Sequence, residues 1–279
     1  NKNLDESNVI IDHGSPNLDY IKKVIIREMK KYSINIQNNL NAIVENWAIK
    51  QEDYEFNKCK KIIVASNFAK RTFLYKKYYD KIYVNNIVTN LDIKINHQKF
   101  EDKIKLIYVG DFSLWKGLHR MIFSLCEQKE FEVELNLVGG DLENHLLYKS
   151  IKNYINDNDK IKIISHGKLK KDKLNRLYKN MNLMIFPSLS DGYGIVVNEA
   201  ISNGIPVICS IYSGAVDLIK KYKLGYSYDP YIKKSLISKL KLIRDRENYL
   251  EIIDNIIKFS LISDQIKSDY ENNLISYIN

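Results

Sequence analysis

A short stretch of the chain holds two carboxylates around two glycines. Asp191 and Glu199 lie eight positions apart, Gly192 and Gly194 fall between them, and Ile195–Asn203 has the pattern of a helix. Glycine lets the backbone approach a ligand closely, and the first turn of a helix favours an anion. Carboxylates beside an anion need hydroxyl partners, which sugars and ribose supply. The pattern predicts a site for a phosphorylated, hydroxyl-rich ligand; an ordinary N-cap acid and a solvent-facing glutamate remain the alternative.

A second candidate element ends another apolar run. The segment Tyr108-Val-Gly-Asp-Phe-Ser-Leu-Trp-Lys-Gly117 contains Gly110 and Lys116 just before a predicted helix. A lysine there is a point cation, which suits an anionic group of a bound ligand. A surface lysine at a helix start is the alternative. The glycine-containing turn at Ser213-Gly214 and the pair Gly139-Gly140 are expected on the same rim.

The elements that position these residues alternate between short apolar runs and longer amphipathic ones. The predicted strands are Ile104–Val109, Glu132–Val138, Ile161–Ser165, Leu183–Phe186 and Val207–Cys209. The predicted helices are Leu118–Glu127, Asn144–Asn156, Lys171–Asn180 and Ile195–Asn203. Such alternation is typical of right-handed βαβ crossovers and a doubly wound parallel sheet. Ligands of these sheets bind beyond the carboxyl ends of the strands, where the candidate residues lie.

The first hundred residues and the tail follow another pattern. We expect helices at Asn17–Tyr32, Asn38–Lys60 and Asn67–Lys77, with strands at Lys61–Ala65 and Lys81–Val84. A polar linker is expected at Asn85–Asp102, and helices at Ile232–Ile243, Tyr249–Phe259 and Asp264–Ile278. The predicted units are therefore a partial α/β domain at 1–95, a ligand-binding domain at 103–260, and a carboxy-terminal helix at 261–279 that packs back on the first unit.

The stretch from Ser188 to Glu199 resembles the signature of family 4 glycosyltransferases, which are retaining enzymes of the GT-B fold. The family usually has glutamate where this chain has Asp191, and often arginine where it has Asp111. The resemblance implies an α/β fold of GT-B type, with a doubly wound, parallel-sheet, Rossmann-like domain beside an incomplete second α/β domain. It implies catalytic roles for Asp191, near the transferred sugar, and for Lys116, at the diphosphate. The implied donor-binding residues are Gly110, Lys116, Gly192, Tyr193, Gly194, Ile195, Glu199, Ser213 and Gly214.

The resemblance extends upstream, through His13-Gly-Ser-Pro16 and Lys61–Lys70, to the latter part of the family's acceptor domain. It does not supply that domain's glycine-rich first loop, so about the first third of the family's length is expected to be missing. The resemblance implies a retaining transfer from a nucleotide-diphosphate sugar to an unknown acceptor. The alternative is a truncated, non-catalytic module that binds nucleotide sugars. His13 either polarises a hydroxyl or is structural.

The charge and the motifs of the chain limit the classes of partner and cofactor that we expect. The net charge is +9 and the pI about 9.1, but the lysines are scattered rather than clustered, which argues against a nucleic-acid-binding protein. No G-x-G-x-x-G follows a strand, which argues against a dinucleotide-dependent oxidoreductase. The sequence does not require a metal, and no cofactor is required beyond the nucleotide-sugar donor. We expect a cytoplasmic enzyme whose acceptor is a glycan, glycolipid or other molecule, and peripheral contact with an acidic membrane surface stays open.

Overall fold

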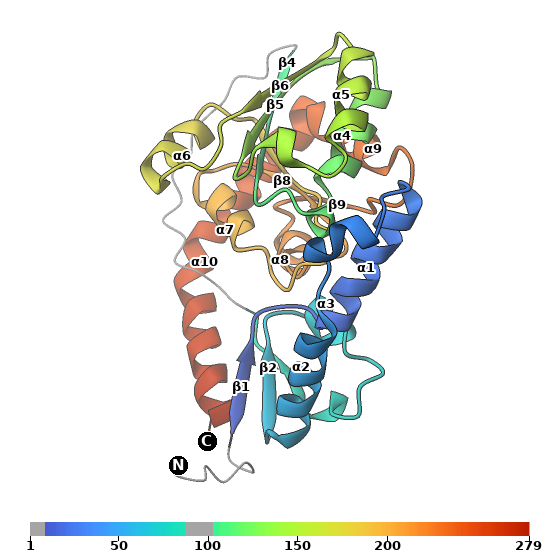
Figure 1. The fold of residues 1–279 in the computed structure, drawn as a ribbon. Helices are drawn as coiled ribbons and strands as arrows, with labels where there is room; N and C mark the ends of the chain where they lie inside the picture. The colour runs from blue at the N-terminus through green and yellow to red at the C-terminus, as the bar shows by residue number, and fades with distance from the viewer. Residues whose placement is uncertain (1–8, 87–102, 279) are drawn as a thin grey trace.

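Two parallel sheets organise the chain in the computed structural model, which describes residues 9–86 and 103–278 (Figure 1). The larger sheet has six strands in the order β6-β5-β4-β7-β8-β9, and the smaller has three in the order β1-β2-β3. The strands of the smaller sheet are β1 (Ile10–His13), β2 (Lys61–Val64) and β3 (Ile82–Val84). Those of the larger sheet are β4 (Lys103–Val109), β5 (Glu132–Val138), β6 (Ile161–Ser165), β7 (Leu183–Phe186), β8 (Val207–Ser210) and β9 (Gly225–Tyr228).

Helices connect these strands and cover the sheets. In the amino-terminal part they are α1 (Leu18–Lys31), η2 (Gln37–Ala42), α2 (Asn46–Lys58), α3 (Asn67–Arg71) and η3 (Tyr79–Lys81). In the rest they are η4 (Leu114–Lys116), α4 (Leu118–Glu127), η5 (Leu142–Asn144), α5 (Tyr148–Asn156), α6 (Lys171–Tyr178), α7 (Ile195–Ser202), α8 (Ala215–Tyr222), α9 (Ser235–Arg244) and α10 (Arg246–Ile278). The mixed α/β architecture with parallel sheets confirms the predicted fold class.

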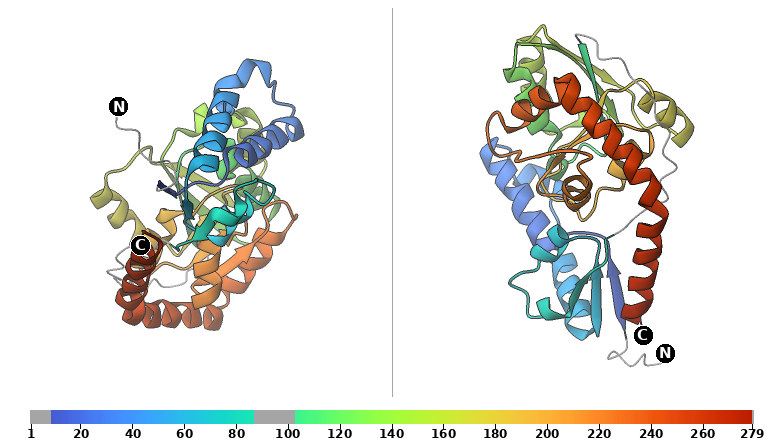
Figure 2. Two further views of the ribbon diagram at one scale, coloured as in Figure 1. Left: turned by 90° about the horizontal axis from the view of Figure 1, so that it is seen from below. Right: turned by 180° about the vertical axis from the view of Figure 1, so that it is seen from behind.

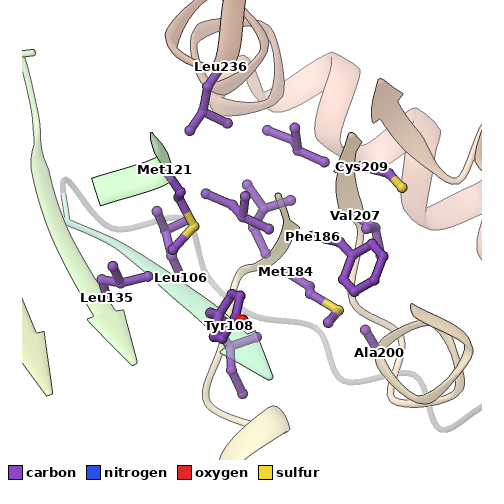
Figure 3. Close-up of a cluster of buried hydrophobic side chains, with 14 of the residues drawn as sticks. Leu106, Tyr108, Met121, Leu135, Met184, Phe186, Ala200, Val207, Cys209 and Leu236 are labelled. Atoms are coloured by element: carbon purple, nitrogen blue, oxygen red, sulfur yellow. The ribbon is translucent and has the colours of Figure 1, made fainter. Parts of the chain in front are cut away.

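The larger sheet carries the main core because its central strands are apolar on both faces. Every residue of β7 and β8 is buried, as expected for parallel strands covered by helices on each side. Leu106, Leu135 and Met184 pack beside Met121 of α4 and Leu236 of α9 (Figure 3). Full burial of one such side chain stabilises a fold by about 1.5–3 kcal/mol. This core holds the ends of β4 and β7 rigidly.

The smaller sheet has its own, more modest core. Phe56 of α2 and Phe73 pack with Ile62 of β2 and Ile82 of β3 on one face of the sheet. On the other face lies α10, whose Tyr277 hydroxyl donates a hydrogen bond of 3.2 Å to the carbonyl of Val84. Figure 2 shows α10 running along one side of the molecule from the larger sheet to the smaller one. The carboxy-terminal helix therefore ties the two sheets together.

Helix α1 belongs to the larger core although it precedes β2 in the chain. Its apolar residues Ile21, Ile25 and Met29 pack into the cluster built on the larger sheet. Between them Glu28 is fully buried and accepts hydrogen bonds of 2.6 and 2.9 Å from Arg120 of α4, and it contacts His119 at 3.0 Å. Burial alone would raise the pKa of Glu28, but the hydrogen bonds from His119 and Arg120 outweigh it and the pKa is lowered.

Several elements differ from those expected. The helix predicted at Asn38–Lys60 is η2 followed by α2, and the helix predicted to reach Lys77 ends at Arg71, where the Thr72 hydroxyl bonds back to the Ala69 carbonyl. The helix predicted from Asn144 is split into η5 and α5, and β1 and β9 were not predicted. The linker predicted at Asn85–Asp102 lies outside the described residues from 87 onward.

The tail is one helix rather than two. The sequence predicted separate helices at Tyr249–Phe259 and Asp264–Ile278, and Ser260 and Ser263 lie between them. Their hydroxyls instead bond to carbonyls three residues earlier, at 2.6 and 2.9 Å, so α10 continues through them from Arg246 to Ile278.

Candidate functional site

A pocket of about 260 Å³ opens where β4 and β7 end side by side. Strand β4 pairs with β5 on one side and with β7 on the other, so the chain order reverses at this point of the sheet. Such switch points are where open parallel sheets bind ligands. The lining residues are Gly14, Tyr108, Val109, Gly110, Asp111, Lys116, Phe186, Asp191, Tyr193, Gly194, Ile195 and Val196.

Lys116 and Asp191 meet inside this pocket. The Nζ of Lys116 lies 2.6 Å from Oδ2 of Asp191, and the two side chains are 23% and 13% exposed. The other carboxylate oxygen of Asp191 accepts the Tyr193 N–H at 3.2 Å. The Asp191 backbone is held by the Tyr212 carbonyl and by the Gly214 N–H. Predicted residues 75 positions apart thus form one cation–carboxylate pair, and a negatively charged ligand can draw the lysine to itself.

Helix α7 points its amino terminus at the same pocket. Gly194 precedes the helix with φ +92°, and a Cβ at this position would lie 2.6 Å from the ring of Phe186. The N–H groups of Ile195 and Val196 belong to the first turn, which has no acceptor of its own within the helix. Both residues line the pocket. The structure places a helix start at the pocket, as the sequence predicted, and anion binding there stays a prediction.

Glu199 lies on the same face of α7, three and four residues beyond the lining residues Val196 and Ile195. Its carboxylate is partly buried. Burial raises the pKa of Glu199, and the charge of Lys171 on α6 acts in the opposite direction. Glu199 does not line the pocket itself; it extends the site along α7 towards α6.

The smaller sheet closes the pocket from the opposite side. Gly192 faces the turn after β1 so closely that a Cβ on it would lie 1.9 Å from the Gly14 carbonyl oxygen. The Ser66 hydroxyl, at the end of β2, donates a hydrogen bond of 2.5 Å to the Gly192 carbonyl. Gly14 and Ser66 were not among the predicted site residues. Ser66 follows a predicted strand, Lys61–Ala65, but Gly14 follows β1, which was not predicted, and the contact of both with Gly192 becomes visible only in the structure.

Other predicted residues lie behind the lining. Ser213 is buried, with its hydroxyl bonded to the Ser210 carbonyl at 3.2 Å and 3.0 Å from the Cys209 sulfur. Gly214 lines a second pocket of about 260 Å³ that lies between α8, α10 and the end of β3 and shares only Tyr193 with the first. A Cβ on Gly139 would lie 2.0 Å from the Gly110 carbonyl, so this glycine permits close packing behind the rim.

His13 ends β1 beside the site, and its ring faces away from the pocket lining into the small core. The ring makes edge contacts with Phe56 and Phe73, and Nε2 lies 3.5 Å from Oε1 of Glu52. Burial lowers the pKa of His13 and raises that of Glu52 to about 7. Both shifts favour the uncharged forms of the two groups over an ion pair. Glu52 also accepts the Leu18 N–H at 3.2 Å and thereby caps α1.

Within residues 9–86 and 103–278, no three His, Cys, Asp or Glu side chains gather as a metal-binding group. Over the same residues, none of the helices combines the length and apolarity that crossing a membrane demands. The cysteines Cys59, Cys126 and Cys209 are free and buried.

Comparison with known proteins identifies the family. Residues 90–259 match the family model described as glycosyl transferases group 1, and this span covers more than half of the chain. The chain belongs to this family. The glycosyltransferase resemblance noted in the sequence is thereby confirmed at the level of the group 1 family.

Curated relatives of this group 1 member include two *Staphylococcus aureus* proteins. The chain is 26% identical over 184 residues to the capsular polysaccharide biosynthesis glycosyltransferase CapM, covering 62% of this chain and 47% of that protein. It is 30% identical over 182 residues to protein CapJ, covering 63% of this chain and 45% of that one. The chain thus spans about half the length of the curated relatives it matches.

Solved structures show the same fold at low sequence identity. Sucrose-phosphate synthase from *Thermosynechococcus elongatus* superposes with a TM-score of 0.65 and 16% identity, over 96% of this chain and 68% of that one. *Anabaena* HepE, solved in complex with UDP and glucose, gives a TM-score of 0.64 and 19% identity, over 81% and 66% of the two chains. The group 1 chain therefore has the GT-B architecture of these enzymes.

Proposed function

We propose that this chain binds the donor of a retaining glycosyltransferase, which moves a sugar from a nucleotide-diphosphate sugar to an acceptor hydroxyl. The observation that carries the proposal is the 2.6 Å pair of Lys116 and Asp191 in a pocket that also receives the first turn of α7. One cationic group and a helix amino terminus suit a diphosphate, and a carboxylate beside them suits a sugar hydroxyl. Family membership and the fold support the same assignment.

The donor's parts are assigned to three places in the site. The diphosphate lies between Lys116 and the N–H groups of Ile195 and Val196. The ribose reaches along α7 to Glu199, whose carboxylate accepts hydrogen bonds from hydroxyls. The transferred sugar lies towards Asp191 and Gly14, between the two sheets. HepE, which shares the fold, was solved in complex with UDP and glucose, and this supports a uridine nucleotide as the first donor to try.

Catalysis in this arrangement is electrostatic. As the bond between the sugar and the diphosphate breaks, negative charge grows on the departing phosphate oxygen, where Lys116 and the α7 amides stabilise it. The acceptor hydroxyl attacks from the face that the diphosphate leaves, so the anomeric configuration is retained, and its proton passes to the departing phosphate. Because these groups neutralise the diphosphate, we propose that transfer needs no metal ion or other cofactor, and that EDTA leaves the rate unchanged.

A thermal-shift screen of UDP-, GDP- and ADP-sugars tests donor binding. A ligand that binds only the folded chain raises its melting temperature in proportion to the logarithm of ligand concentration. We expect one nucleotide class to shift the midpoint more than the others. If none of the three classes shifts it at millimolar concentration, the donor assignment is wrong.

The second candidate function is that of a nucleotide-sugar-binding module without catalysis, which is favoured by a pocket lined almost entirely from the larger sheet, with Gly14 as the lining residue of the amino-terminal part. Slow hydrolysis of the donor, followed by NMR, separates the two. A catalytic chain releases sugar with the anomeric configuration of the donor. A module that binds the donor without any release would support the second candidate.

The acceptor and the location belong to the same proposal. We propose a hydroxyl-bearing glycan or glycolipid as the acceptor, bound on the Gly14 side of the pocket. The nucleotide-sugar donor and three buried free cysteines fit a cytoplasmic protein.

A further inference from the structure

Four large apolar side chains are exposed on the outer surface of the smaller unit. Trp47 and Tyr54 lie on α2 and are 67% and 56% exposed. Leu74 and Tyr75, between α3 and β3, are 51% and 96% exposed. We refer to these four residues as the aromatic patch. Single exposed apolar residues need no explanation, but aromatic residues that recur on one helix face beside an exposed Leu-Tyr pair point to a partner.

The two parts of the aromatic patch are held next to each other. Residues 47 and 54 are two turns apart on α2 and share a face opposite the buried Glu52 and Phe56. The segment after Tyr75 is tied to α2 by Asp53, whose carboxylate accepts hydrogen bonds from Lys76 at 2.8 Å and from the Tyr78 hydroxyl at 2.7 Å.

The surroundings of the patch are basic. Lys58 lies 4.5 Å from the centre of the Tyr54 ring, and Arg71 and Lys77 flank Leu74 and Tyr75 in sequence and are exposed. In the two segments that carry the patch, 45–58 and 70–81, the solvent-accessible cations are Lys50, Lys58, Lys70, Arg71, Lys76, Lys77 and Lys81, against the acids Glu45, Asp53, Glu55 and Asp80. The local field therefore favours an anionic partner.

The shape fits a lipid surface. The loop with Leu74 and Tyr75 projects from the molecule beyond α2, on the side away from β1, in both Figure 1 and the rear view of Figure 2. A projecting tip with two adjacent apolar side chains enters a bilayer interface without needing a matching pocket. Tryptophan and tyrosine are the residues that prefer that interface, and lysine and arginine bind anionic headgroups.

We propose that the aromatic patch and its flanking cations dock the chain on a membrane surface rich in anionic lipid. Tyr75 and Leu74 enter the headgroup region, Trp47 and Tyr54 lie along it, and Arg71 and Lys77 contact lipid phosphates. This inference concerns a surface outside the donor pocket and does not depend on the proposed transfer reaction.

Co-sedimentation with vesicles tests the proposal in the full chain. We expect binding to vesicles of phosphatidylglycerol and phosphatidylcholine in equal parts and little binding to phosphatidylcholine alone, with a loss of binding as salt rises. The double variant Leu74→Ser with Tyr75→Ser, and separately Arg71→Glu with Lys77→Glu, should each weaken binding by roughly tenfold.

Matched controls change equally exposed residues elsewhere. Ile232 and Leu261 are 61% and 81% exposed, and both are changed to serine in one control. Lys149 and Lys173 are exposed on α5 and α6 and are changed to glutamate in the other. We expect both controls to bind anionic vesicles as the wild type does. Circular dichroism melting confirms that each variant is folded.

Tryptophan fluorescence gives a readout at the patch itself. The chain has two tryptophans, so in a Trp115→Phe variant the emission comes from Trp47 alone. We expect its emission to shift to the blue on adding anionic vesicles. The proposal is overturned if the wild type ignores anionic vesicles, which would leave the patch to a protein partner, or if patch and control variants lose binding equally.

Discussion

At the scale of single residues, the proposed donor site contains two ionisable groups that are expected to bind different parts of the ligand. Lys116 is a cation next to the helix start, whereas Glu199 is a carboxylate further along α7 whose pKa is raised by burial. A cation recognises phosphate, and a carboxylate recognises hydroxyls. The two residues should therefore respond differently to ligands that carry only one of these parts.

Replacing Glu199 by alanine should weaken the binding of a nucleoside diphosphate but leave the binding of inorganic pyrophosphate unchanged. The ribose hydroxyls would lose their acceptor, which we expect to reduce nucleotide affinity by roughly tenfold, the equivalent of one hydrogen bond to a charged group. Competition titrations of the variant and the wild type with both ligands measure this. Equal weakening of both would show that Glu199 does not hold the ribose.

Glu52 should make the stability of the chain depend on pH. Its pKa is raised from 4.5 to about 7 in the folded chain, so between these values the folded state binds more protons than the unfolded state. Stability must then fall as pH rises through that window, by on the order of 2–3 kcal/mol when the change is complete. Urea unfolding at pH 5 and pH 8 measures this fall as the difference between the wild type and Glu52→Gln, because His13 and His145, whose pKa values burial lowers, act in the opposite direction.

The same titrations on Glu52→Gln should lack this part of the pH dependence, since glutamine does not ionise. Glu55→Gln, an exposed position on the same helix, serves as the control and should keep the wild-type profile. A wild-type profile in Glu52→Gln would assign the pH dependence to another group.

At the scale of elements, the start of α7 depends on a glycine that serves two purposes. Gly194 adopts a positive φ, and its missing Cβ leaves room for the ring of Phe186. Gly167 also has a positive φ, of +62°, but nothing lies within 4 Å of a Cβ placed there. The two positions therefore separate backbone strain from steric conflict.

Gly194→Ala should destabilise the chain more than Gly167→Ala. Both pay the strain of a positive φ, and the additional crowding against Phe186 should cost about 1–3 kcal/mol more. Urea denaturation of the two variants gives the difference. If the two midpoints agree, the ring of Phe186 moves aside freely and the helix start is not tightly packed.

The elements of the larger sheet could be predicted because local pattern and tertiary environment agree there. Strands β5, β6 and β7 are continuous apolar or alternating runs, and their observed bounds equal those expected from the sequence. Strand β1 was not predicted because its four residues show little periodicity. It is stabilised by its pairing with β2. The break expected near Ser260 is absent because the Ser260 hydroxyl donates a hydrogen bond to the Ile257 carbonyl within α10, so the helix continues.

The candidate site was predictable in part, for a reason that lies in the fold. Lys116 and Asp191 could be placed near each other because parallel strands end at one edge of the sheet. Their direct pairing depends on rotamers and loop geometry, which one sequence does not specify. Gly14 and Ser66 become part of the site because the two sheets contact each other there, and no local sequence pattern predicts such a contact.

At the scale of the whole molecule, two long helices link the sheets in opposite directions along the chain. Helix α1 leaves the smaller sheet to pack on the larger core, and α10 leaves the larger core to pack on the smaller sheet. The pocket that we propose for the donor is contacted from the smaller sheet by Gly14. The pocket therefore depends on attachments far from its lining.

The attachment of α1 should be sensitive to Glu28. Glu28→Gln would leave Arg120 buried without its charged partner, which we expect to cost about 3 kcal/mol. Glu130→Gln removes an exposed pair with Lys241, whose side chains are 63% and 49% exposed, and should change stability by less than about 0.5 kcal/mol. Denaturant unfolding compares the two. Equal effects would mean that the buried cluster adds nothing to the attachment.

Isothermal titration calorimetry with UDP, GDP and ADP tests the central claim most directly. We predict saturable binding of at least one nucleotide at one site, weakened at least roughly tenfold by Lys116→Ala, since a charge-assisted contact to phosphate contributes about 1.5–3 kcal/mol. Lys149→Ala, which removes an equal charge from the exposed surface of α5, should bind as the wild type does. Absence of binding by all three nucleotides, or equal affinity in Lys116→Ala and the wild type, would contradict the account.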